Sequence, residues 1–235
     1  MTPFDQPVDV FNRQYLSKGL GAQRRYPNES LIQFLASRYF SLPEAERKSI
    51  RILEVGCGSG ANLWMMAKEG FSTHGVDGSA KGLELARRHL EEKWGVTAEL
   101  RECSFTRLPY EGDFFDAVVD VVSLQHINLD DSRLALQEVC RVLKPGGAFF
   151  SYRLSDHSVM YEHSGGERID AVTVDNIVDA SLPLANNGPV SFASPALARL
   201  MYQEAGLKVE AIERVGRTYP TGAYLEYLAI SAEKN

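Results

Sequence analysis

Three glycines alternate in the segment EVGCGSG, at positions 56, 58 and 60. The apolar run 50–55 precedes this segment and the helix-forming run 62–70 follows it, which is typical of a strand-to-helix junction. Glycine can adopt positive φ and lets the backbone approach a ligand closely, while the start of the following helix presents free N–H groups. The pattern therefore predicts a loop that holds a polar ligand at the end of a strand.

An acidic residue, Asp77, ends the next apolar run, 71–76. If both runs are parallel strands, their carboxyl ends share one edge of the sheet, and a carboxylate there can accept hydrogen bonds from both hydroxyls of a ribose. The glycines alone would suit a turn without a ligand about equally well. Asp77 is therefore the residue that favours a nucleoside site.

The same loop also fits G-x-G-x-x-A through Gly56, Gly58 and Ala61, the fingerprint of nicotinamide dehydrogenases. Such an enzyme needs an acid–base couple for hydride transfer, and the chain contains no Tyr-x-x-x-Lys pair. It also ends in a predicted strand pair that a simple dinucleotide-binding half does not need. An NAD-dependent oxidoreductase stays as an alternative.

Short apolar runs that alternate with helical patterns indicate the fold class. Strands are predicted at 50–55, 71–76, 96–102, 114–122, 147–153, 207–215 and 224–232. Helices are predicted at 62–70, 79–93, 131–143 and 195–205. Asn28 and Ser79 are expected to be helix N-caps. This alternation predicts a mostly parallel sheet with helices on both faces.

Composition indicates a globular protein and limits the kinds of partner that it can bind. The chain has 235 residues, 44% of them hydrophobic, and a net charge of -6, which fits one globular domain and disfavours a broad nucleic-acid surface. Two basic pairs are interpreted as solvated helix faces: Arg24-Arg25 and Arg87-Arg88. Three cysteines lie far apart and predict neither a disulfide framework nor a metal site: Cys57, Cys103 and Cys140. We expect a cytoplasmic protein without a signal peptide or membrane span, and a homo-oligomer stays open.

Four ordered motifs carry a family resemblance: E-V-G-C-G-S-G, H-G-V-D-G-S, L-P-Y-x-x-x-x-F-D-A-V-V and L-Q-E-V-C-R-V-L-K-P-G-G. Over residues 27–153 the chain resembles the class I S-adenosylmethionine-dependent methyltransferases, and within them the small-molecule group called methyltransferase type 11. The resemblance implies a Rossmann-like seven-stranded sheet, mostly parallel, with one antiparallel strand near an edge. It also implies S-adenosylmethionine as the cofactor and S-adenosylhomocysteine as its product.

The resemblance further implies which residues bind the cofactor. Gly56, Gly58 and Gly60 would line its methionine part, with Glu54 supporting the loop. Asp77 would contact the ribose. The other implied contacts are to the adenine, by Gly78, Ser104 and Phe105, and to the methionine end, by Asp120 and Val121. At 104 the family has an acidic residue, so the serine hydroxyl is a weaker partner for the adenine amino group.

A methyl acceptor that is a hydroxyl also needs a base, and His126 is the candidate. It follows the strand 114–122 at the sheet edge where the acceptor is expected, and an imidazole with a pKa near ~6.5 suits proton abstraction at neutral pH. The alternative is that His126 only packs under the cofactor. Other residues are expected near the acceptor: Tyr15, Arg25 and Tyr26 in the lead-in, Tyr152, Arg153 and Tyr219 at the sheet edge, and His157 with His163 in the insertion. Arg153 could bind an anionic group.

These observations predict a single methyltransferase domain, 1–235, with four parts. They are a helical lead-in (1–48), a cofactor-binding core (49–153), a polar insertion after the fifth strand that covers the substrate (154–193), and a closing helix with a strand pair (194–235). The predicted reaction is methyl transfer to an O or N atom of a small molecule, such as a sugar or secondary metabolite. A non-catalytic module that binds S-adenosylmethionine is the second alternative.

Overall fold

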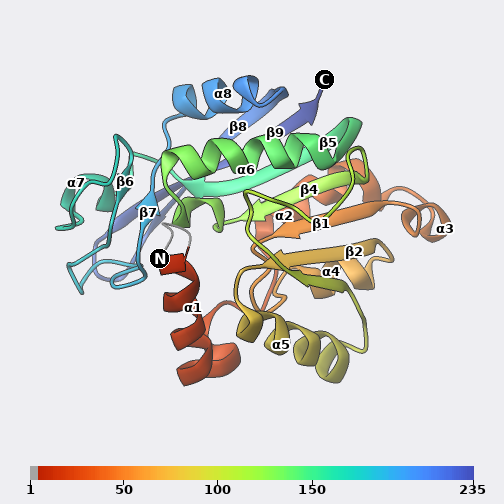
Figure 1. The fold of residues 1–235 in the computed structure, drawn as a ribbon, viewed down its shortest axis with the longest axis horizontal. Helices are drawn as coiled ribbons and strands as arrows, with labels where there is room; N and C mark the ends of the chain where they lie inside the picture. The colour runs from red at the N-terminus through yellow and green to blue at the C-terminus, as the bar shows by residue number, and fades with distance from the viewer. Residues whose placement is uncertain (1–4) are drawn as a thin grey trace.

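A seven-stranded sheet runs through the molecule, with helices on both faces (Figure 1). The computed structural model describes residues 5–235, with side chains from residue 8 onward. The strands are β1 (Arg51–Val55), β2 (Ser72–Asp77), β3 (Glu99–Glu102), β4 (Phe115–Val121), β5 (Leu143–Leu154), β8 (Leu207–Thr218) and β9 (Tyr224–Lys234). Their order is β3-β2-β1-β4-β5-β9-β8, and β9 runs antiparallel to both of its neighbours. The predicted strands and the antiparallel strand near the edge are confirmed.

The strand order places a binding site at one particular edge. The chain moves outward from β1 to β2 and β3, then returns to add β4 on the other side of β1. In the parallel register Val55 pairs with Val76 on one side and with Asp120 on the other. Ligands of open α/β sheets bind outside the carboxyl ends of the strands at such a reversal. The ends of β1 and β4 therefore frame the expected site.

Helices cover both faces because the central strands are apolar on both faces. Along β1 the burial pattern is one exposed residue followed by four buried ones. On one face Leu53, Val118 and Phe149 pack under α6 (Leu129–Val142) and α8 (Pro195–Glu204). On the other face the core lies under α2 (Glu29–Leu35), α4 (Leu63–Lys68) and α5 (Ala80–Arg88).

The predicted helix caps are present. The Asn28 side chain accepts a hydrogen bond from Leu31 N at 3.0 Å, and Ser79 Oγ accepts one from Gly82 N at 2.9 Å. Each cap satisfies an N–H group that has no partner within the first helical turn. The remaining helical elements are α1 (Asp5–Lys18), η1 (Gly19–Ala22), η2 (Ala36–Phe40), α3 (Glu44–Arg47), η3 (His89–Trp94), η4 (Leu124–His126) and α7 (Met160–His163). The helical lead-in is thus confirmed over its described part.

The insertion after β5 has a core of its own, which the sequence analysis did not expect. It carries α7 and a two-stranded sheet of β6 (Thr173–Val174) and β7 (Val190–Ser191). Its buried residues Met160, Ile177 and Phe192 form a separate apolar cluster with Leu225 of β9. These apolar residues are spaced irregularly, so no periodicity in the sequence reveals this core.

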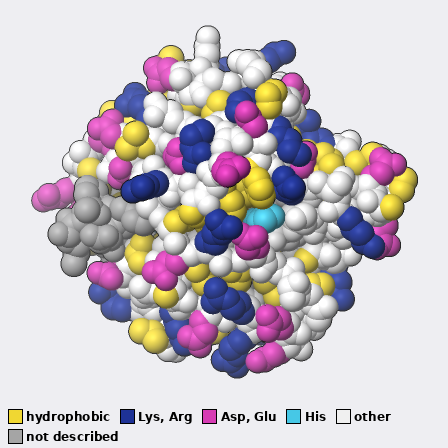
Figure 2. Space-filling model, turned by 45° about the vertical axis from the view of Figure 1, so that its right-hand side comes forward, with side chains coloured by type: hydrophobic (Ala, Val, Ile, Leu, Met, Phe, Trp, Pro, Cys, Tyr) yellow, Lys and Arg dark blue, Asp and Glu magenta, His cyan; other side chains and the backbone are white. Residues whose placement is uncertain are grey.

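The surface carries charges of both signs. On the face shown in Figure 2, Lys and Arg side chains are interspersed with Asp and Glu side chains. No helix within the described residues is long and apolar enough to cross a membrane.

Candidate active site

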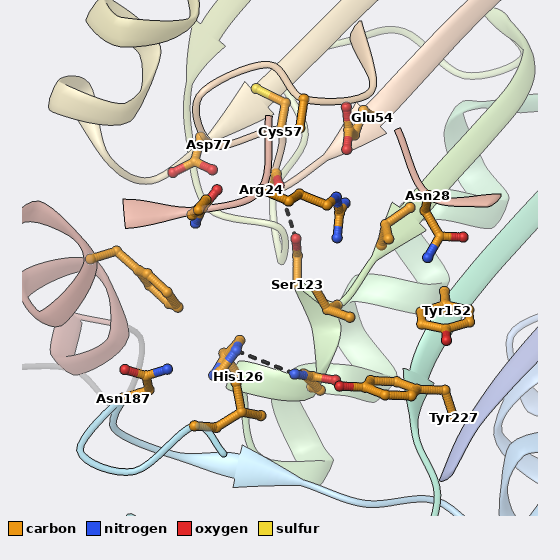
Figure 3. Close-up of a pocket in the computed structure, with 18 of the residues that line it drawn as sticks. Arg24, Asn28, Glu54, Cys57, Asp77, Ser123, His126, Tyr152, Asn187 and Tyr227 are labelled. Atoms are coloured by element: carbon orange, nitrogen blue, oxygen red, sulfur yellow. Dashed lines mark hydrogen bonds between the residues drawn. The ribbon is translucent and has the colours of Figure 1, made fainter. Parts of the chain in front are cut away.

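A cavity of about 740 Å³ opens at the carboxyl ends of β1 and β4 (Figure 3). Its walls come from α1, residues 22–30, the glycine loop, the turn after β4, the ends of β5, β8 and β9, and residues 184 and 187 of the insertion. Segments from the whole length of the chain therefore meet at the edge that the strand order indicates.

The glycine loop fits tightly against its neighbours. Gly56 has φ +69° and Gly58 has φ +51°, in the left-handed region that disfavours other residues. A Cβ atom on Gly56 would collide with the Ser123 side chain, and one on Gly58 would lie 2.6 Å from the Tyr15 hydroxyl. Gly56 lines the cavity, whereas Gly58 and Gly60 are not part of its lining. The loop can therefore pack this closely against Ser123 and Tyr15 only because these two positions are glycines.

Asp77 lies at the cavity wall with its carboxylate already oriented. Oδ2 accepts a hydrogen bond from Gly58 N at 2.8 Å, and Oδ1 accepts one from Ser79 N at 2.8 Å. Burial raises the pKa of Asp77, and the two backbone N–H groups oppose that shift. Each carboxylate oxygen has a second acceptor position. The residue can therefore accept ribose hydroxyls without rearranging, beside Gly78, which also lines the cavity.

Glu54 and Arg24 place an acidic and a basic side chain at one end of the cavity. Glu54 is 2% exposed, and its Oε1 accepts a hydrogen bond from Asn62 Nδ2 at 2.5 Å. Its Oε2 is buried without a hydrogen-bond partner in the part of the chain that the structure describes. Burial raises the pKa of Glu54 to about 8, while Asn62 and the Arg24 guanidinium lower it. The Arg24 side chain reaches into the cavity (Figure 3).

The turn after β4 is held by Asp120. This buried carboxylate accepts hydrogen bonds from Ser123 N and Leu124 N, both at 3.0 Å, and from Ser151 Oγ at 2.7 Å. Asp120 does not line the cavity, whereas Val121 does. Val122 has φ +62°, which is rare for a β-branched residue and is typical of positions under functional constraint. Asp120 therefore fixes the turn that lines the cavity without lining the cavity itself.

His126 faces the cavity in one defined tautomer. Its Nδ1 lies 3.0 Å from Pro189 O, so Nδ1 carries the proton and donates it to that carbonyl. Its Nε2 lies 3.4 Å from Gln125 Nε2, and Gln125 Oε1 accepts from Leu154 N, which turns the amide N–H₂ toward the imidazole. Burial lowers the pKa of His126 to about 4. At neutral pH the ring is uncharged, and its Nε2 lone pair accepts the long hydrogen bond from the Gln125 amide.

Aromatic rings form the wall at the other end. Tyr152 and Tyr227 stack with ring centroids 4.7 Å apart and an interplanar angle of 14°. Tyr219 also lines the cavity, and the Arg217 guanidinium lies 4.9 Å from the centre of its ring. Phe105 contributes to the lining near Asp77, whereas the Ser104 hydroxyl bonds to Thr106 and lies outside it.

Several expected residues lie away from the cavity. Tyr26 is 62% exposed and contacts Trp64 edge to face, and Arg25 is not part of the lining. Arg153 is buried on the other face of β5, where its Nη2 donates to Ser191 Oγ. His157 and His163 are exposed. None of these residues lines the cavity.

Sequence reasoning missed Arg24, Arg217 and Tyr227. Arg24 is exposed, but it does not belong to a helix face as expected. It precedes α2 in an irregular segment and lines the cavity. Tyr227 offered no local signal, because the two tyrosines of YLEYLAISA, Tyr224 and Tyr227, are three residues apart and therefore lie on opposite faces of the strand. Arg217 offered none.

Comparison with known proteins identifies the family. A family model for a methyltransferase domain matches residues 52–147. A ubiquinone biosynthesis O-methyltransferase of Thiobacillus denitrificans is 32% identical over 170 residues, which make up 72% of this chain and 68% of that protein. A relative of the same name from Chelativorans sp. is 35% identical over 103 residues, or 44% of this chain and 40% of its own length.

The fold agrees with this assignment. A solved S-adenosylmethionine-dependent methyltransferase from Methanosarcina mazei superposes with a TM-score of 0.70 at 19% identity, covering 89% of this chain and 98% of that one. Neither the dehydrogenase nor the non-catalytic alternative fits these relatives. The chain belongs to the class I S-adenosylmethionine-dependent methyltransferases, and it uses S-adenosylmethionine to methylate a small molecule.

Proposed function

We propose that the acceptor atom is a hydroxyl oxygen and that His126 takes up its proton. The observation that carries this proposal is the tautomer of His126 at the cavity wall: its Nε2 is unprotonated and accepts only a long hydrogen bond of 3.4 Å from the Gln125 amide, which an acceptor hydroxyl can replace. A neutral amine can be methylated without a base, whereas a hydroxyl generally needs one. The name of the Thiobacillus relative, an O-methyltransferase, supports the same choice.

The residues present fit the cofactor. Gly56 lines the cavity, where its backbone would face the methionine part, and Asp77 has free acceptor positions for the ribose. We assign the two charges of the methionine group to Arg24, for the carboxylate, and to the unpartnered Oε2 of Glu54, for the ammonium. Binding an ammonium group would favour the ionised form of Glu54. When bound, S-adenosylmethionine supplies a methyl group already activated by its sulfonium sulfur.

The chain's own contribution is alignment and removal of a proton. Phe11 packs edge to face on His126 with ring centroids 5.0 Å apart, and Pro189 O fixes the ring from behind. His126 Nε2 would receive the hydroxyl proton as the oxygen is methylated. A weakly basic imidazole suffices because the oxygen becomes strongly acidic as its new bond forms.

A two-panel assay tests this proposal. Release of S-adenosylhomocysteine is measured with matched hydroxyl and amine compounds, using the wild type and His126→Asn. We expect turnover of hydroxyl compounds only, and a loss of roughly 10²–10⁴-fold in kcat for the variant with unchanged affinity for S-adenosylhomocysteine. Turnover of the amines, or a variant that methylates hydroxyls at the wild-type rate, would refute it.

A second proposal concerns the cover of the site. Tyr15 of α1 and Asn187 of the insertion both line the cavity, and Gln14 Nε2 donates to Asn187 Oδ1 at 2.6 Å. We propose that α1 and the 184–189 part of the insertion close over the acceptor together. The polar contact between them is small enough to open for ligand exchange.

A further inference from the structure

The acceptor end of the cavity differs chemically from the cofactor end. The cofactor end contains Asp77, Glu54 and Arg24, so its charges are mixed. The other end is walled by Tyr152 on β5, Tyr227 on β9 and Tyr219 just after β8. Figure 3 shows Tyr152 and Tyr227 on the opposite side of the cavity from Asp77. Arg24 lies between the two ends, since its charge also lowers the pKa of Tyr152, whereas Asp77 lies away from the tyrosine wall, which leaves that wall to the acceptor.

The stacked rings of Tyr152 and Tyr227 favour a flat ligand at this wall. Tyr152 and Tyr227 are nearly parallel, at 14°, with centroids 4.7 Å apart. Aromatic rings attract a further planar ring in offset or edge-to-face arrangements, beyond the gain from apolar burial alone. Tyr15 at the opposite wall and Phe11 beside His126 are also aromatic and line the same cavity. A flat aromatic molecule can stack on these rings with its whole face.

Arg217 adds a positive charge to the same end. It lines the cavity at the end of β8, and its guanidinium lies over the Tyr219 ring. Burial raises the pKa values of Tyr152 and Tyr227, and the Arg217 charge lowers both, as the Arg24 charge does at Tyr152, so the Arg217 cation is close to the aromatic wall. Within residues 8–235 it makes no ion pair with an acidic side chain, whereas Arg214 on the same strand lies 3.6 Å from Glu226.

We propose that the acceptor is a hydroxylated aromatic compound with an anionic substituent such as a carboxylate, and that Arg217 is the residue that selects it. This inference rests on the proposed function. The ring lies along the tyrosine wall, the hydroxyl faces His126 Nε2, and the anion binds the Arg217 guanidinium. A guanidinium suits this role because it matches a carboxylate with two parallel N–H donors and stays charged at any working pH.

Binding of matched ligands tests the charge preference directly. Affinities of the enzyme saturated with S-adenosylhomocysteine are measured calorimetrically for mono- and dihydroxybenzoates and for the corresponding carboxamides. The carboxylate and carboxamide members have the same ring, hydroxyl pattern and size, and they differ in charge. We expect the acids to bind about tenfold or more tightly than the amides, as a charge-assisted contact implies.

Variants separate Arg217 from general effects. Arg217→Gln should bring the acid-to-amide ratio close to one while its affinity for S-adenosylhomocysteine stays unchanged. Arg199→Gln, at an exposed position on α8 outside this cavity, should keep the wild-type ratio. Tyr227→Leu should weaken acids and amides alike, because it removes stacking area and not charge.

The outcomes distinguish this inference from the proposed function. Wild-type enzyme that binds the amides as tightly as the acids, or an unchanged ratio in Arg217→Gln, overturns the inference even if hydroxyl compounds are methylated. Methylation of aromatic amines instead of hydroxyls, with the acid preference and its loss in Arg217→Gln intact, overturns the proposed function and leaves the role of Arg217 standing.

Discussion

Buried, uncharged His126 should make the protein less stable in mild acid. Its pKa is about 4 in the folded chain, against ~6.5 in an unfolded one. Below pH 6.5 the unfolded chain binds a proton that the folded chain does not, so this contribution to stability is complete above pH 6.5 and is lost as the pH falls toward 4. Between pH 7 and pH 5 the two pKa values give a loss of about 2 kcal/mol in the free energy of unfolding.

Comparison with a variant isolates this effect. His74 and His89 also have lowered pKa values, and the raised pKa of Glu54 acts in the opposite direction, but all three are common to the wild type and to His126→Asn. The asparagine amide can still donate to Pro189 O. Urea unfolding at pH 7 and pH 5 should therefore show the wild type losing about 2 kcal/mol more than the variant.

A matched control is the exposed His157. His157→Asn should retain the wild-type loss between pH 7 and pH 5. If the wild type and His126→Asn lose the same stability over that interval, His126 is not held neutral by burial. The argument that its Nε2 is unprotonated at neutral pH would then fail, and with it the basis for assigning a hydroxyl acceptor.

Four further outcomes are expected. Asp77→Ala should weaken calorimetric binding of S-adenosylhomocysteine about tenfold or more, and an unchanged Kd would remove Asp77 from the site. Gly56→Ala should abolish that binding, whereas Gly95→Ala, which has a similar φ of +62° but open space around it, should keep it; equal binding by both would contradict the steric argument. Arg24→Gln should weaken S-adenosylhomocysteine but not methylthioadenosine, which lacks the carboxylate, and a parallel loss would place Arg24 elsewhere. Hydrogen exchange in 154–193 should slow when S-adenosylhomocysteine and acceptor bind, and unchanged protection would argue against the proposed cover.

The fold could be predicted from the sequence because its signals are local. The strand β1 is a short apolar run, and the caps at Asn28 and Ser79 are side chains followed at once by helical periodicity. Strand order is a longer-range property and was not predicted, whereas the antiparallel strand near one edge was implied by the family resemblance. The glycine loop and Asp77 were found for the same local reason, since each lies directly at the end of a strand.

The acceptor end could be predicted only in part, because its residues come together through the tertiary fold. Tyr152 and Tyr219 were expected there and line the cavity, whereas Arg217 and Tyr227 also line it and were not expected. Neighbouring arginines cannot be told apart without the backbone path: Arg24 faces the cavity, whereas Arg25 next to it does not. Arg153 was expected at the open edge, but strand alternation sends its side chain to the opposite face from Tyr152.

The insertion has a role beyond covering the acceptor. Pro189 lies just before β7, and its carbonyl is the group that accepts the His126 Nδ1 proton. Gln125 is fixed in turn by Leu154 N, at the end of β5 where the insertion begins. Both ends of the insertion therefore decide which nitrogen of His126 carries the proton and which one is unprotonated. Since the position of Pro189 depends on the apolar cluster around Phe192, packing that lies outside the cavity determines whether the imidazole presents a lone pair to the acceptor.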